Sequence, residues 1–165
     1  MIGKIVTGKS FGGAVRYLLG KEPGKAYILT SDGVELTSRQ ALIGSFEFQR
    51  RARPDVERVV GHISLSFHPD DDPRMSNRLM LDLAREYMQR MEITGTQYLV
   101  VRHTDTKHPH LHILYNRVRY DMTLVPDRNE RLRNMRICKE LKQVYGLTFS
   151  HGKEQVATER LHGPE

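Results

Sequence analysis

The chain has 165 residues, of which 38% are hydrophobic, so it is long enough for one well-buried domain, cramped for two, and unlike a disordered protein. Its net charge of +6 and its pI of about 9.6 are typical of proteins that bind a polyanion. No apolar run is long enough for membrane insertion or a secretory signal, and the single Cys138 excludes an internal disulfide, so a reducing cytoplasm is the expected location.

The first predicted elements are a strand at residues 2–7 and a helix at residues 11–19. Ser10 is a suitable N-cap for this helix, and Gly20 stands where a left-handed residue commonly ends one. The apolar residues of the helix form a single stripe, and Tyr17 lies well away from the centre of that stripe. Its ring is therefore expected to face solvent or a cleft, although exposed tyrosines without a function are common.

The middle of the chain predicts two strands and two helices. The first strand covers residues 26–30 and ends at a Ser-Asp-Gly turn signal. A helix at residues 38–52 begins at Ser38 and stops before a proline. A long strand at residues 56–67 follows. Residues 76–92 form the clearest helix, because their apolar residues recur at spacings of three and four.

The last part of the chain predicts two strands and a helix. The strands, at residues 97–104 and 109–118, are joined by a tight connection. They must pair antiparallel, because a parallel crossover needs a longer link. The helix at residues 129–145 has Asn129 as a candidate N-cap and Gly146 as its stop.

The resulting order, β-α-β-α-β-α-β-β-α, predicts an α+β fold with a mostly antiparallel central sheet flanked by helices. No internal repeat or linker divides the chain. One domain is therefore expected over residues 1–150. Residues 151–165 are polar and lack periodicity, so they are expected to form a tail or the truncated start of a C-terminal region.

Four of the eight histidines lie within ten residues of one another. Side chains alternate along a strand, so His108, His110 and His112 share one face, and the hairpin brings His103 back toward them. Packing alone gives no reason to gather polar rings on one face. Three imidazoles from paired strands can bind a divalent ion and leave a coordination position open, so the cluster predicts a catalytic metal site.

Two neighbouring features extend this polar face. Asp105 lies two residues after His103, where its carboxylate could accept a ring N–H from a ligand histidine or take a proton from a nucleophile. A turn residue that bonds its own backbone is the alternative. On the preceding strand, His62, Ser64 and Ser66 alternate with apolar residues, which extends the polar face or marks a sheet wetted on one side.

Tyr17 and the histidine cluster make more chemical sense together than separately. A phenol is a weak nucleophile at neutral pH, because its ordinary pKa is about 10. It needs an adjacent base, a cation or a metal-polarised target to attack a phosphate. A metal held by three histidines could polarise such a phosphate and offset the charge that develops during transfer.

These residues resemble a known family. The motif His-x-Asp-x-x-His-Pro-His-x-His at residues 103–112, followed by Asn116, resembles the metal motif of conjugative and mobilisation relaxases, which belong to the HUH endonuclease superfamily. The segment Phe-Gly-Gly-Ala-Val-Arg-Tyr at residues 11–17 resembles the N-terminal catalytic-tyrosine motif of that family. Residues 137–147 are similar to the end of a relaxase core. The resemblance covers about residues 1–149 and implies a relaxase-like fold.

The resemblance implies site- and strand-specific nicking and rejoining of DNA at a plasmid or mobile-element origin of transfer. Tyr17 would attack the scissile phosphate and hold a 5′-phosphotyrosyl link, which can be reversed because both exchanged bonds are phosphodiesters. Asp105 would orient a histidine or assist the deprotonation of Tyr17. Asn116 would help to place the metal site or the DNA. Arg16 and Lys107 are, with Asn116, the residues expected to bind the substrate, the two cations through its phosphates.

The resemblance also implies the metal and the partners. His103, His110 and His112 would carry magnesium or manganese, whereas the ligand chemistry alone suits zinc, copper or nickel better. His108 is a rival ligand, and His62 is a candidate accessory residue. The implied substrate is single-stranded DNA at an origin of transfer, with accessory relaxosome proteins and a coupling protein as candidate partners.

Three other interpretations are open. A rolling-circle replication initiator of the same superfamily uses similar chemistry, but its histidine pair usually precedes the tyrosine, whereas Tyr17 comes first here. A basic module that binds DNA without cleavage would leave the histidine cluster without a purpose. A metal-dependent hydrolase would use activated water in place of the tyrosine.

Overall fold

The computed structural model describes residues 1–149, and its elements follow the predicted order with one short 3-10 helix added. They are β1 (Ile2–Gly8), α1 (Phe11–Leu19), β2 (Ala26–Asp32), α2 (Arg39–Arg50), β3 (Val60–Ser66), η1 (Pro69–Arg74), α3 (Asn77–Arg90), β4 (Tyr98–His103), β5 (His110–Asn116) and α4 (Glu130–Tyr145). None of the helices in this range is long and apolar enough to cross a membrane. The expected tail at residues 151–165 lies outside the described residues.

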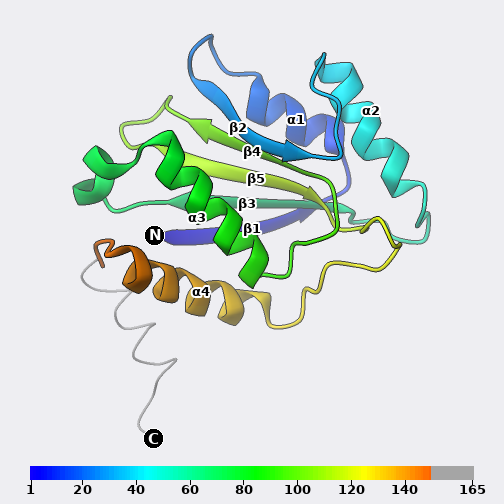
Figure 1. The fold of residues 1–165 in the computed structure, drawn as a ribbon. Coiled ribbons are helices and arrows are strands. Elements are labelled where there is room, and N and C mark those ends of the chain that lie inside the picture. The colour runs from blue at the N-terminus through cyan, green and yellow to red at the C-terminus, as the bar shows by residue number, and fades with distance from the viewer. Residues whose placement is uncertain (150–165) are drawn as a thin grey trace, which may run out of the picture.

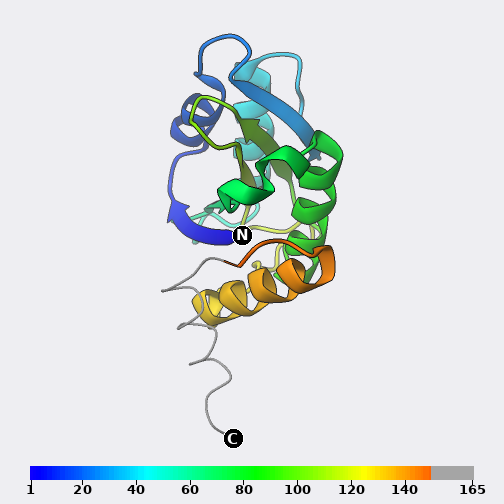
Figure 2. The same cartoon turned by 90° about the vertical axis from the view of Figure 1, so that its left-hand side faces the viewer.

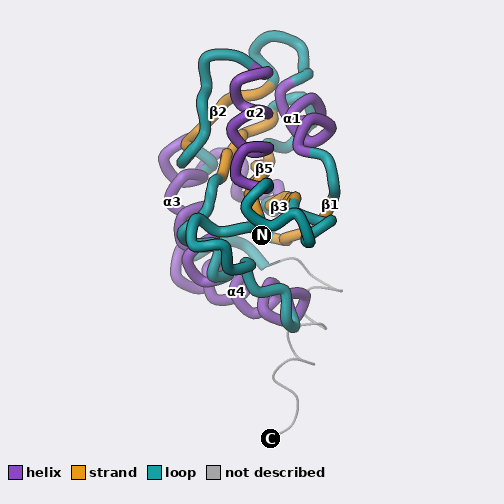
Figure 3. Tube along the Cα trace, turned by 90° about the vertical axis from the view of Figure 1, so that its right-hand side faces the viewer, coloured by secondary structure: helices purple, strands orange, loops and turns teal. Residues whose placement is uncertain are grey.

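Five strands form one antiparallel sheet in the order β1-β3-β5-β4-β2, so β1 and β2 are its edges (Figure 1). Helices α1 and α2 pack on one face of the sheet, and α3 and α4 pack on the other (Figures 2 and 3). Because side chains alternate along each strand, the sheet supplies a separate apolar core to each pair of helices. The predicted α+β fold is confirmed.

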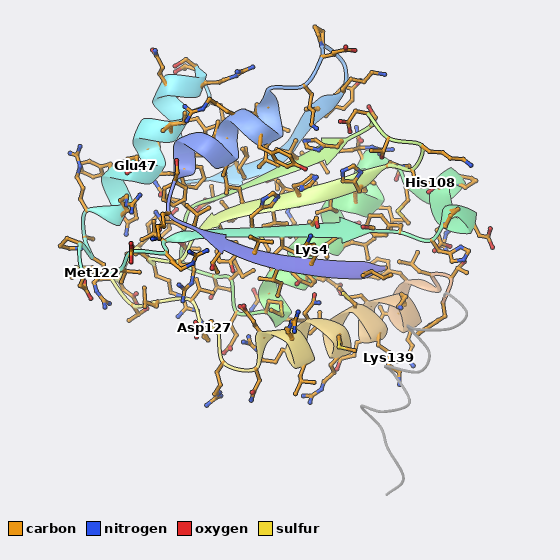
Figure 4. The ribbon with its side chains drawn as sticks, turned by 180° about the vertical axis from the view of Figure 1, so that it is seen from behind. Lys4, Glu47, His108, Met122, Asp127 and Lys139 are labelled. Carbon is orange, nitrogen blue, oxygen red and sulfur yellow. The ribbon has the colours of Figure 1, made fainter. Side chains whose placement is uncertain are left out.

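Helices α1 and α2 leave part of their face of the sheet uncovered. Lys4 and Val6 on β1 pair with Ser64 and His62 on β3, so all four side chains lie on this face. Lys4 and Val6 are exposed, and Figure 4 shows Lys4 on a strand with no helix in front of it. We call the surface formed by these four residues the open sheet face.

Strand β3 is shorter than the predicted strand at residues 56–67. Val60 already pairs with Gly8, the last residue of β1, and with Asn116, the last residue of β5. Residues 56–59 therefore have no strand beside them. The end of β3 is decided by the lengths of its neighbours, which the local pattern does not contain.

Three of the five helix-terminal residues predicted from the sequence have the expected capping role in the structure. The hydroxyls of Ser10 and Ser38 each accept a hydrogen bond from the backbone N–H three residues on, and Gly146 is left-handed with φ of 64°. Gly20 is not left-handed, because its N–H continues the helical bonding pattern at φ of −79°. Asn129 is wrong as an N-cap: its own backbone is left-handed, and its side chain makes no capping bond.

Position 61 requires a glycine because the Tyr115 ring lies directly over it. Gly61 lies directly opposite Tyr115 across the β3–β5 pair, and an added Cβ would overlap the buried Tyr115 ring. We expect Gly61→Ala to lower the free energy of unfolding by about 1–3 kcal/mol, the usual cost of overpacking a core, as measured by chemical denaturation. Gly44→Ala is the matched control, because nothing lies within 4 Å of an added Cβ there. Equal stability of the two variants would contradict this account.

Candidate metal centre and nucleophile

Three of the predicted histidines meet at one end of the sheet. His103 ends β4, His110 begins β5 directly opposite it, and His112 lies two residues further along β5 on the same face. One nitrogen from each ring lies within 4.8 Å of the corresponding nitrogens of the other two. His103 and His112 are buried, and His110 is partly buried. Because two hydrogen-bonded strands carry all three rings, the backbone fixes their spacing.

The hydrogen bonds of two of these rings determine which nitrogen is free. His103 Nε2 lies 2.8 Å from the carbonyl oxygen of Leu18, which can only accept, so Nε2 carries the proton and Nδ1 keeps a lone pair. His110 Nδ1 lies 3.3 Å from the hydroxyl of Thr106. That hydroxyl donates its own proton to the carbonyl oxygen of His108, so His110 donates from Nδ1 and keeps a lone pair on Nε2.

The site fits a divalent cation. The nitrogens His103 Nδ1 and His112 Nε2 are buried and have no hydrogen-bond partner among the described residues, which is costly unless a ligand takes their lone pairs. Burial, with His103 adding to it, lowers the pKa of His112 to about 2, and burial also lowers the pKa of His103. Both rings are therefore neutral at neutral pH, as metal ligation requires. Three imidazoles leave further coordination positions open.

Helix α1 places Tyr17 beside these rings. Phe11, Val15 and Leu18 are fully buried against the sheet, whereas Tyr17 is 55% exposed, which agrees with its position off the apolar stripe. Its ring centroid lies 6.0 Å from that of His112. The ring also lines a pocket of about 350 Å³ together with residues of the open sheet face. The Tyr17 phenol and one candidate metal ligand, His112, thus line the same pocket.

Lys21 belongs to this site and was missed from the sequence, where a lysine just after a helix is too common to notice. Its Nζ lies 5.0 Å from the centroid of the Tyr17 ring and 2.9 Å from Oδ2 of Asp105. The hydrogen bond from Lys21 lowers the pKa of Asp105, so this carboxylate is charged at neutral pH. The structure thus corrects the expected bond from a histidine to Asp105: the carbonyl of Leu18 accepts the N–H of His103 instead.

Asn116 and His108 do not join the cluster. Asn116 lies at the far end of β5, fully buried, and its Nδ2 donates to the Gln97 side chain and the Phe46 carbonyl oxygen. Its predicted role at the DNA or the metal is therefore replaced by a role in the core. His108, labelled in Figure 4, hydrogen-bonds through Nδ1 to the carboxylate of Asp72, which holds the ring outside the group of three histidines.

The remaining predicted residues are His62, Arg16 and Lys107. His62 on β3 lines it, and its Nε2 lies 2.8 Å from Nδ1 of His112. Arg16 is exposed next to Tyr17 on α1, and Lys107 is exposed in the connection between β4 and β5. The contact of these two cations with DNA stays a prediction.

Comparison with known proteins identifies one family and several solved structures with a similar fold. The family model described as relaxase, MobA/VirD2-like, nuclease domain, matches residues 17–147. No curated protein matches the sequence. The manganese-bound MobM relaxase domain (MOBV; Mob_Pre) with plasmid pMV158 oriT DNA, crystallised at pH 4.6, has a TM-score of 0.62 at 12% identity, over 94% of this chain and 93% of that one.

Two further solved structures have a similar fold. The MobM relaxase domain bound to 26 nucleotides of pMV158 oriT DNA has a TM-score of 0.61 at 14% identity, over 93% of this chain and 92% of that one. A structure concerned with the molecular basis of vancomycin resistance transfer in Staphylococcus aureus has a TM-score of 0.53 at 13% identity, over 90% of this chain and 96% of that one. At such identities these likenesses establish the shared fold.

Proposed function

This chain belongs to the relaxase family with a MobA/VirD2-like nuclease domain, and from this premise we propose that it nicks and rejoins one strand of DNA at a plasmid or mobile-element origin of transfer. Membership in a nuclease family makes it a DNA endonuclease with the fold of the MobM relaxase domain. We assign the nuclease domain to residues 1–150 and single-stranded DNA as its substrate. Accessory relaxosome proteins and a coupling protein are candidate partners.

The observation that carries the proposal is the position of Tyr17 beside the histidine cluster. Tyr17 lines one pocket with His112, and its ring centroid lies 6.0 Å from that of His112 and 6.3 Å from that of His103. In the proposed step, the Tyr17 oxygen attacks the scissile phosphorus and loses its proton. A new bond joins this oxygen to phosphorus, and the bond from phosphorus to the 3′ oxygen breaks. The 3′ oxygen takes up a proton and leaves as a free hydroxyl, while the 5′ phosphate stays on Tyr17. The reverse attack by a 3′-hydroxyl rejoins the strand.

His103, His110 and His112 are the proposed metal ligands. When bound there, a divalent ion supplies Lewis-acid polarisation of the scissile phosphate. Magnesium or manganese is the proposed ion, and the MobM relaxase domain contains manganese. The contribution of the chain is to hold three imidazoles with one nitrogen of each close to the others, so that little reorganisation is needed on binding.

The pocket also supports a single strand as the substrate. It is lined by Lys4 and Val6 of the open sheet face, which offer a positive charge and an apolar surface next to Tyr17. Grooves that bind single strands combine cations for the phosphates with apolar or aromatic surfaces for the bases. Arg16 and Lys107 are proposed to contact phosphates that flank the scissile one.

Lys21 is proposed to stabilise negative charge beside Tyr17, with Asp105 as the positioning residue that holds it there. We expect Lys21→Met to slow single-turnover cleavage by about 10–100-fold, somewhat less than the loss of an oxyanion-hole donor costs. Quenched-flow cleavage of a labelled strand measures this rate. Lys21→Arg should restore part of it, and Lys25→Met, an exposed lysine of the same connection, should leave it unchanged. Equal rates for Lys21→Met and Lys25→Met would contradict the role of Lys21.

One incubation tests the proposed function. A single strand that carries the origin sequence is labelled at its 3′ or 5′ end, mixed with the protein and Mn²⁺, and resolved on a denaturing gel. A 5′-phosphotyrosyl link predicts that the 3′ label moves with the protein and that the 5′ label is released on a shorter fragment. Release of both labels would indicate a hydrolase, and uncut DNA a binding module. Mapping the nick on a plasmid separates a relaxase from a replication initiator.

A further inference from the structure

His62 makes a hydrogen bond that the metal site itself does not explain. It lies on β3, beside β5, and its Nε2 is 2.8 Å from Nδ1 of His112. The two ring centroids are 5.0 Å apart. His62 is not among the three rings whose nitrogens converge. It therefore contacts a candidate ligand from outside the cluster.

The three ligand rings differ in what fixes their protons. Acceptor oxygens hold the proton of His103 on Nε2 and that of His110 on Nδ1, so the other nitrogen of each ring is free to ligate. The partner of His112 Nδ1 is another imidazole, which can either donate or accept. His112 Nε2 has a lone pair for a metal only when Nδ1 carries the proton. Whether His62 accepts or donates in this hydrogen bond thus decides whether Nε2 of His112 can bind a metal.

His62 packs among apolar and aromatic side chains. Its strand neighbours are Val6 on β1 and Leu114 on β5, and the Tyr17 ring centroid lies 5.9 Å away. A neutral ring that accepts at Nε2 carries its proton on Nδ1. Because His62 lines the pocket, water can accept that hydrogen bond.

We propose that His62 is a positioning residue for the metal site: its Nε2 accepts the Nδ1–H of His112 and so directs the Nε2 lone pair of His112 into the cluster. This inference rests on the proposed metal site. Hydrogen-bonded partners of metal-bound histidines fix the tautomer and the ring orientation and raise the basicity of the ligating nitrogen. Here an imidazole from a third strand has the place that a carboxylate or a carbonyl often takes.

The Mn²⁺ affinity of the full chain tests the proposal without any measurement of cleavage. The EPR signal of free Mn²⁺ gives the affinity in a titration. His62→Gln is expected to bind Mn²⁺ almost as the wild type does, because its amide oxygen can take nearly the place of Nε2. His62→Asn, with the same amide on a shorter side chain, cannot reach His112 and is expected to bind about 10–100-fold more weakly.

The control variant is Ser64→Ala. Ser64 lies on the same face of β3 as His62 and is the strand partner of His112 on β5. Its replacement should leave the Mn²⁺ affinity unchanged. Thermal unfolding without metal checks that all variants are equally folded. Wild-type affinity in His62→Asn would overturn the role of His62 while leaving the metal site intact. Equally weak binding by the Asn and Gln variants would overturn it as well. A wild-type protein that binds no Mn²⁺ would instead remove the proposed metal site, and this inference with it.

Discussion

Replacement of Tyr17 by phenylalanine is expected to reduce the covalent protein–DNA adduct by at least about 10³-fold, the scale on which loss of a nucleophile lowers catalysis. The change removes only the phenolic oxygen. The ring stays on an exposed side chain beside His112, so folding and metal binding should be unaffected. DNA binding should also change little, because Lys4 of the pocket remains. A denaturing gel with a labelled single strand measures the adduct, and a gel-shift assay measures binding.

Tyr27 provides the matched control for this variant. It is also exposed, but it lies on β2 opposite Arg102, and the two line a different pocket with Asn77 of α3. The Tyr27 hydroxyl is therefore on the face of the sheet away from the histidines. Tyr27→Phe should give the adduct at the wild-type yield. A normal adduct yield from Tyr17→Phe, with loss in Tyr27→Phe, would move the nucleophile to the other face.

The elements with local signals were predictable from the sequence. Helix α3 has an apolar spacing that only a helix satisfies. Ser10 and Ser38 indicate helix starts, because each caps its helix through a hydrogen bond to a backbone N–H only three residues away. The hairpin of β4 and β5 follows from the short connection between them. The end of β3 depends instead on how far β1 and β5 extend beside it, and that information is tertiary.

The candidate site divides in the same way. The convergence of His103, His110 and His112 follows from strand alternation and one hairpin, and the outward direction of Tyr17 follows from the helical stripe. The ion pair that brings Lys21 over Tyr17 depends on how α1 sits on the sheet. No spacing in the sequence encodes that placement. Likewise, Asn116 follows the histidine motif closely in sequence, yet it lies in the core at the far end of the strand.

Loss of a single ligand should prevent metal binding while the protein stays folded. His112→Ala removes a buried nitrogen that has no other partner among the described residues, so Mn²⁺ affinity is expected to fall by more than about 100-fold, beyond the loss typical of an outer partner. Adduct formation should fall with it. Thermal unfolding with and without Mn²⁺ provides a second readout. At about 100 times its dissociation constant, Mn²⁺ should stabilise the wild type by about 2.7 kcal/mol and His112→Ala far less.

His108→Ala is the control that decides between the rival ligands. His108 lies in the same motif, but its ring is bonded to Asp72 and lies outside the convergent group. Its loss should therefore leave both Mn²⁺ affinity and the adduct close to the wild type. If His108→Ala lost Mn²⁺ affinity while His112→Ala retained it, His108 would be a metal ligand and His112 would not. Adduct formation by the wild type in excess chelator would contradict a metal requirement altogether, because Tyr17 would then attack without any ion at the three histidines.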